Sequence, residues 1–185
     1  MKRLVFSSIL IAAAAPILLR AATATDSPRV TRSTLITTEE SLDKRYKQLW
    51  SDNLVVVPGP TRGVYLEGYG AVFTTEVNLV AGPAIFMFHP EVTPDEKKQH
   101  HARKLQRLPE LRRALQEFLV ATAATLDTVP DDGQIVLVAM LAKFPWEDLS
   151  GLPQQIMVQG QKKKLIDAKK SGATNLADVV RVIEN

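Results

Sequence analysis

Residues 69–79 alternate between an apolar and a more polar face, which is the period-2 pattern of a half-buried β-strand. Gly68 and Gly70 flank the start of this run and indicate a hairpin turn or a bulge between two strands. A continuous apolar run over 135–144 predicts a central strand. Three further strands are predicted at residues 54–57, at residues 84–88 and at residues 156–160.

Two of these predictions leave alternatives open. The apolar residues 84–88 fit either a short strand or an apolar loop packed on the core. The strand that starts at 156 is expected to run on through Lys162–Lys164 as an exposed edge, where lysines discourage pairing with another sheet.

Apolar residues recur at helical spacing at both ends of the expected domain. The first helix is predicted to start near Thr38 and to direct Tyr46 and Trp50 toward the core. Apolar positions within 176–183 predict a short last helix.

A long helix is predicted between the two groups of strands. The run Thr93–Glu96 combines a capping threonine, a proline at the first helical position and a glutamate at the capping-box position. Helical character continues to about Leu126. Pro109 lies inside this segment, and proline in a helix interior predicts a kink or a break near Leu108.

The order of elements is strands, a long helix, strands and a helix. This order predicts an α+β fold, with an antiparallel or mixed sheet of about four to five strands packed on one face by helices. The expected organisation is a signal peptide over 1–24, a flexible leader over 25–34 and a single domain over 35–185.

The first 24 residues have the three regions of a cleavable secretory signal. A basic start precedes an apolar run over 4–19, and a small-x-small site at 22–24 predicts cleavage before Thr25. A membrane-spanning helix needs about 20 apolar residues, and this run is shorter and contains Pro16. We therefore expect a periplasmic or secreted protein with no transmembrane helix after cleavage.

Charge and cysteine content narrow the function classes. The chain has 23 Lys and Arg against 20 Asp and Glu. Lys2, Arg3 and Arg20 lie in the signal, which holds no acidic residue, so the remainder has a formal net charge of zero. Nucleic-acid binding normally needs a basic excess and is not expected. The absence of cysteine excludes disulfides, thiolate metal sites and a cysteine nucleophile.

The long predicted helix carries a weak metal-site pattern. Glu96 and His100 are four residues apart, so they share a helix face and can chelate an ion. His101 points about 100° away from His100 on a helix of 3.6 residues per turn. Because zinc requires three or four convergent ligands, solvated histidines are the favoured interpretation and no metal site is assigned.

The same helix carries a basic stripe formed by Lys97, His100, Arg103, Lys104 and Arg107. Such a stripe can meet an anionic partner, lipid head groups or acidic glycans. The favoured interpretation is an ordinary solvated face, because most charge runs only solvate a helix.

Two aromatic stretches are further binding candidates. Arg62, Tyr65, Glu67 and Tyr69 surround the two glycines, and glycine with tyrosine suits close approach of a ligand. The alternative is a hairpin whose tyrosines stack across strands. Trp146 adjoins two carboxylates in a predicted loop and can line a pocket, although packing over the sheet end is favoured.

The stretches Tyr65–Phe73 and Trp146–Pro153 resemble a class of uncharacterised exported bacterial proteins. The resemblance implies a bacterial envelope setting and carries no catalytic residue.

The sequence also lacks a nucleophile elbow, a P-loop, a dinucleotide fingerprint and an EF-hand loop.

These observations favour a non-catalytic binding or interaction domain of the cell envelope. It would bind an unknown protein or small-molecule partner through the tyrosine-glycine hairpin and the sheet edge, with no cofactor. The alternative is a small metal-assisted hydrolase built around Glu96 and His100.

Overall fold

The computed structural model describes residues 30–50, 59–83 and 91–185. The expected signal peptide and the strand predictions at 54–57 and 84–88 lie outside the described residues.

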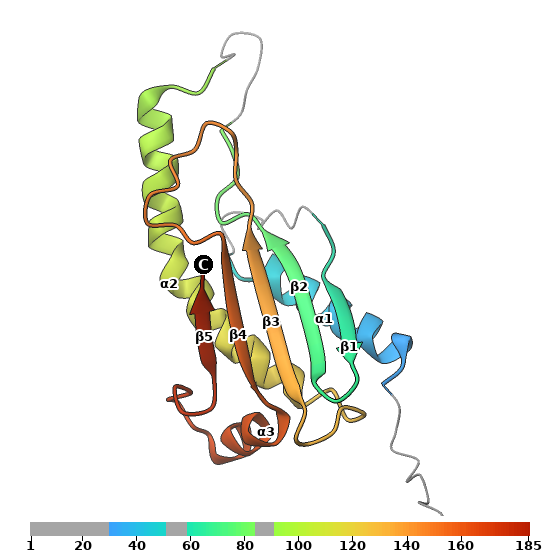
Figure 1. Cartoon of the computed structure of the whole chain (residues 1–185). Coiled ribbons are helices and arrows are strands. Elements are labelled where there is room, and N and C mark those ends of the chain that lie inside the picture. The colour runs from blue at the N-terminus through green and yellow to red at the C-terminus, as the bar shows by residue number, and fades with distance from the viewer. Residues whose placement is uncertain (1–29, 51–58, 84–90) are drawn as a thin grey trace, which may run out of the picture.

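A five-stranded mixed sheet forms the centre of the described structure, and it confirms the predicted α+β class (Figure 1). The strands lie in sequence order across the sheet. β2 and β3 are parallel and every other neighbouring pair is antiparallel. The strands are β1 (Arg62–Leu66), β2 (Gly70–Val77), β3 (Gln134–Leu141), β4 (Gln155–Gln161) and β5 (Arg181–Glu184).

The helices pack on one face of this sheet, as the sequence predicted. Figure 1 shows α1 (Arg32–Lys47) and α2 (Pro94–Ala123) behind the strands, and α2 is the crossover between parallel strands β2 and β3. Tyr46 and Trp50 are buried, as predicted. The largest fully buried side chains are Tyr46, Phe73, Leu42, Leu79, Leu111, Leu115, Leu119, Leu126, Ile135, Leu137, Ile156 and Leu165.

The helix starts follow their capping residues. Thr31 caps α1 through the backbone N–H of Thr34, so the helix begins at Arg32 rather than near Thr38, and the last residues of the expected leader are helical. In α2, Thr93 and Glu96 form the predicted capping box. The helix then passes through Pro109 unbroken, and Figure 1 shows its axis changing direction part-way along.

The C-terminal region differs from the sequence prediction. Residues after β4 form helix α3 (Lys162–Ser171) instead of extending the strand, and β4 lies inside the sheet rather than at an edge. The Lys162 side chain is buried, and its ammonium donates to the backbone oxygens of Asp127 and Val129. The predicted last helix over 176–183 is also wrong, because its final residues belong to β5.

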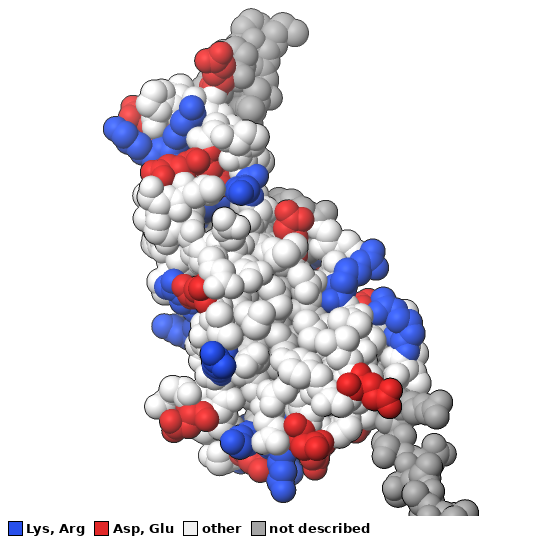
Figure 2. All heavy atoms as spheres, viewed as in Figure 1, with Lys and Arg blue, Asp and Glu red and all other residues white. Residues whose placement is uncertain are grey.

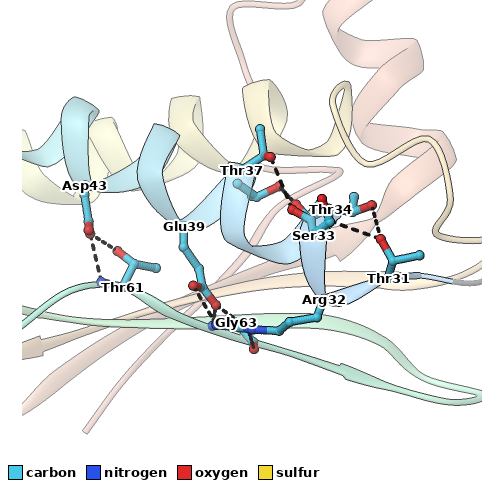
Figure 3. A network of polar contacts seen from close by, with 10 residues as sticks. Thr31, Arg32, Ser33, Thr34, Thr37, Glu39, Asp43, Thr61 and Gly63 are labelled. Carbon is cyan, nitrogen blue, oxygen red and sulfur yellow. Dashed lines mark hydrogen bonds and ion pairs between the residues drawn. The ribbon is translucent and has the colours of Figure 1, made fainter.

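Side chains of α1 cover the outer edge of β1 (Figure 3). Glu39 accepts the Gly63 N–H at 2.7 Å, and Arg32 donates to the Gly63 oxygen at 3.1 Å while also pairing with Glu39. Asp43 accepts the N–H of Thr61 at 2.8 Å in the same way. An edge strand normally exposes these backbone groups to other chains, so α1 closes this part of the edge.

The opposite face of the sheet carries no helix in the described residues. Figure 2 views this face and shows an uncharged centre with Lys, Arg, Asp and Glu at the margins. Val136 and Val138 at its centre are buried among neighbouring side chains, whereas Val64 and Met140 are exposed. None of the described helices has the length and apolar character needed to cross a membrane.

Candidate functional site

The two parallel strands end together, beneath the N-terminal half of α2. The N–H of Ala142 donates to the oxygen of Val77 at 3.0 Å, which keeps the chain after β3 beside the end of β2. Residues 142–154 then form a loop that returns to β4. Ligands of open α/β sheets bind beyond the carboxyl ends of parallel strands, so this end of the fold is the place to look for a site.

Three charged or polar side chains meet there, and we refer to Lys104, Glu147 and His100 as the Lys104 cluster. Lys104 Nζ donates to Glu147 Oε2 at 2.7 Å and to the backbone oxygen of Ala142 at 2.9 Å. His100 Nε2 lies 2.7 Å from Glu147 Oε1. His100 and Lys104 are four residues apart on α2, so both reach the same carboxylate from one helix face.

The Lys104 cluster is almost completely removed from solvent. The exposed fractions of the side chains are 4% for Lys104, 2% for Glu147 and 5% for His100. Burying charges costs several kcal/mol per ion unless each is paired and hydrogen-bonded. The bonds described above meet that requirement for the ammonium and the carboxylate.

The electrostatics of the cluster favour a neutral histidine. Burial lowers the pKa of His100 below its usual 6.5, and the hydrogen bond that Glu147 accepts and the Glu147 charge only partly oppose this effect. Because Glu147 already accepts a hydrogen bond from Lys104, we assign the Nε2 proton to His100 and the acceptor role to the carboxylate. Nδ1 of His100 then holds a lone pair, and nothing in the described ranges donates to it.

Aromatic rings fix the loop against the helix. The rings of Phe144 and Trp146 stack with 5.3 Å between their centroids and 5° between their planes. The Trp146 ring also meets His100 edge-on at 5.0 Å. Gly82 lies so close that a Cβ there would fall 2.9 Å from Phe144 Cζ, so the loop after β2 packs tightly on the same rings.

Two cavities adjoin the Lys104 cluster. The first has a volume of about 320 Å³, and Lys104 is part of its wall. The second has a volume of about 310 Å³ and includes His100. The first cavity is lined by Lys104, Leu141, Ala142, Lys143, Leu149, Leu152, Pro153 and Gln154. The second cavity is lined by Val80, Ala81, Gly82, Pro83, Glu96, Gln99, His100 and Arg103.

The structure brings together residues from three candidate sites of the sequence. His100 was a metal candidate and, with Lys104, part of the basic stripe, whereas Trp146 was a loop aromatic. Glu147 joins them, and the sequence offered it only as one of two loop carboxylates beside Trp146, because its partners on α2 are distant in sequence. The only readable signal was the four-residue spacing of His100 and Lys104 on one helix face.

The basic stripe is not a continuous exposed surface. Lys104 is buried, which removes it from any membrane or glycan contact. Arg107 lies with its guanidinium carbon 5.0 Å from the centroid of the Trp50 ring and donates to the oxygen of Leu79. Apolar packing and backbone acceptors hold the side chains of Lys104 and Arg107 against the protein, and helix periodicity alone does not predict this placement.

The two metal candidates line the same cavity but have other partners. Glu96 Oε2 accepts from the backbone and hydroxyl of Thr93 in the capping box, and His100 Nε2 faces Glu147. Across the described ranges, no three His, Cys, Asp or Glu side chains are grouped as metal ligands.

The turn between β1 and β2 lies at the other end of the sheet. Arg62 and Tyr65 belong to β1, and Glu67 and Tyr69 lie in the turn that leads into β2 (Figure 1). Tyr65 pairs with Ala71 and is half-buried against the core, whereas Tyr69 is exposed. These residues and Trp146 therefore do not form one binding site.

Comparison with protein-family models, with curated proteins and with solved structures finds no match to this chain. The site is therefore interpreted from its geometry and chemistry alone.

Proposed function

We propose that the chain is an exported, non-catalytic domain of the cell envelope that binds a small molecule at the Lys104 cluster. The observation that carries this proposal is a paired and almost completely buried Lys–Glu–His network that adjoins two cavities at the carboxyl ends of β2 and β3. Apolar residues of similar volume would often fill such a position at least as stably, so the charges point to a role beyond packing.

The cavities support a small-molecule ligand. Their volumes of about 320 and 310 Å³ fall at the lower end of the range that small ligands occupy. Each contains a polar group of the Lys104 cluster together with backbone and apolar surface, which is the usual composition of a ligand pocket. The signal pattern over 1–24 and the resemblance to exported bacterial proteins support the envelope location.

The β1 edge gives weaker support for a protein partner. The backbone groups of Gly63 and Thr61 are already bonded to Glu39, Arg32 and Asp43, so an added strand would have to displace these side chains. We therefore place the binding function at the Lys104 cluster rather than at the hairpin.

Native mass spectrometry of the protein isolated from an envelope fraction tests this proposal. We expect a mass that matches cleavage before Thr25, together with a small-molecule adduct. Leu152→Trp adds bulk to the first cavity and Gln99→Trp to the second, so one of them should remove the adduct. Lys98→Ala, at an exposed position on α2 outside both linings, should retain it. An unliganded native protein, or an adduct that survives both tryptophan variants, would contradict the proposal.

One observation favours the alternative of a metal-assisted hydrolase: Glu96 and His100 line the same cavity. Metal content of the purified protein and its thermal stability with added Zn²⁺ test this alternative. Stoichiometric metal that is lost in His100→Gln would favour the hydrolase, whereas no bound metal and no stabilisation would remove it.

A further inference from the structure

The first cavity has an amphipathic lining. Leu141, Leu149, Leu152 and Pro153 provide apolar surface, and Lys104 and Lys143 provide two ammonium groups. Leu149 is exposed and lies in the loop between β3 and β4. This combination suits a ligand with an apolar body and one polar end.

Lys104 has an unused hydrogen-bond donor. An ammonium group has three N–H donors. Two of them are directed to Glu147 and to the oxygen of Ala142, and no acceptor among the described residues takes the third. Lys104 is also one of the residues that line the first cavity, and we infer that its third N–H donates to an acceptor bound there.

The charge around the cavity favours a monoanion. Glu147 balances Lys104, and its own carboxylate is enclosed between Lys104 and His100. Lys143 is exposed and adds one positive charge at the wall. The net positive charge is therefore one unit with His100 neutral, which complements a single carboxylate better than a doubly charged phosphate.

We propose that the first cavity binds a small monocarboxylate with an apolar body, whose oxygens accept from Lys104 and Lys143. The inference rests on the proposed binding function and specifies its ligand class. The apolar body lies against the leucines and Pro153, and the carboxylate lies toward α2. This arrangement makes the Lys104 cluster the anchor for the ligand as well as for the loop.

Calorimetric titration of the purified protein with three probes tests the ligand class. Octanoate has both the apolar body and the carboxylate, 1-octanol lacks the charge, and acetate lacks the apolar body. We expect saturable binding of one octanoate, at least about tenfold weaker binding of octanol and no measurable binding of acetate. Equal affinities for octanoate and octanol would overturn the proposal.

A pair of variants at one position tests the charge directly. Leu149→Asp places a carboxylate in the lining and Leu149→Asn places a neutral group of the same shape there. We expect octanoate to bind about fivefold more weakly to the Asp variant than to the Asn variant, as one unfavourable charge contact near a surface predicts. Equal affinities for the two variants would contradict an anionic ligand.

A second pair tests the assigned lysine. Lys143→Ala should weaken octanoate binding by about threefold, because it removes a partly solvated charge partner. Lys98→Ala removes the same charge from an exposed site outside the lining and should leave the affinity unchanged. Equal effects of the two variants would contradict a direct contact with Lys143.

The outcomes separate this inference from the proposed function. If octanoate does not bind while a native adduct is still removed by Leu152→Trp, the carboxylate class is wrong and the binding function stands. If the native protein carries no adduct and octanoate does not bind, both proposals fail.

Discussion

Replacement of Glu147 by glutamine tests how the buried ends of β2 and β3 are held together. The variant keeps the shape of the side chain but removes the negative charge between Lys104 and His100. The Lys104 ammonium then stays buried without a countercharge. Removing one partner of a buried ion pair typically costs about 3–5 kcal/mol, and the 2.7 Å contacts and low exposure of this pair place Glu147→Gln in that range.

Urea denaturation followed by circular dichroism measures this effect. The double variant Lys104→Met with Glu147→Gln removes both charges, and we expect it to lie within about 2 kcal/mol of the wild type. Glu117→Gln, at an exposed site on α2, is the matched control and should change stability by less than about 0.5 kcal/mol. The reasoning is refuted if Glu147→Gln costs less than about 1 kcal/mol, or if the double variant is as unstable as the single one.

Three further predictions concern other parts of the fold. Gly63→Ala should destabilise the protein by about 2 kcal/mol in urea denaturation, because the added Cβ would lie 2.6 Å from a ring carbon of Phe73. Gly59→Ala is the control and should be nearly neutral, because the space around Gly59 is open. Equal effects of the two variants would contradict this packing. Because folding lowers the pKa of His100, the free energy of unfolding should fall as the pH drops below about 6.5, by at most about 1.4 kcal/mol per pH unit for this group. Denaturation between pH 7 and 5 should show a smaller dependence in His100→Asn, and an unchanged slope would argue against a neutral buried histidine. Arg112→Ala removes a partly exposed ion pair in which Arg112 donates to both carboxylate oxygens of Glu184. The variant should lower the free energy of unfolding by about 1 kcal/mol in the same assay. An unchanged free energy would show that this ion pair does not stabilise β5.

Local patterns predicted the elements whose burial follows a regular period. The alternation over 69–79 corresponds to β2, where Phe73 and Thr75 are buried and Glu76 is exposed. The continuous apolar run after residue 134 became the central strand β3. β2 is buried mainly on one face and β3 on both faces over most of its length, so each sequence carries the signal of its own burial.

The errors arose where burial is decided by distant residues. Three consecutive lysines suggested a solvated edge strand, but Lys162 directs its ammonium to backbone oxygens of the turn before β3 and begins α3. Residues 176–183 have helical spacing, but the last of them belong to β5, which pairs with β4 and makes β4 an inner strand. A one-sequence pattern does not contain these tertiary partners.

The same limit applies to the candidate site. The helix spacing placed His100 and Lys104 on one face, but the sequence interpreted that face as a solvated basic stripe. The third member, Glu147, is reached only after the chain has crossed the sheet, so no local spacing links it to α2. The closed loop between β3 and β4, with Trp146 packed on His100, depends on contacts of the same long range.

The location of bound octanoate is the most direct test of the account. Backbone amide NMR spectra of the purified protein, recorded with and without saturating octanoate, would show which residues the ligand affects. We expect shifts concentrated in residues 100–107 and 141–154, which contain the Lys104 cluster and all the lining residues of the first cavity. Shifts centred on the hairpin at 65–70, with none at Lys104, would contradict it.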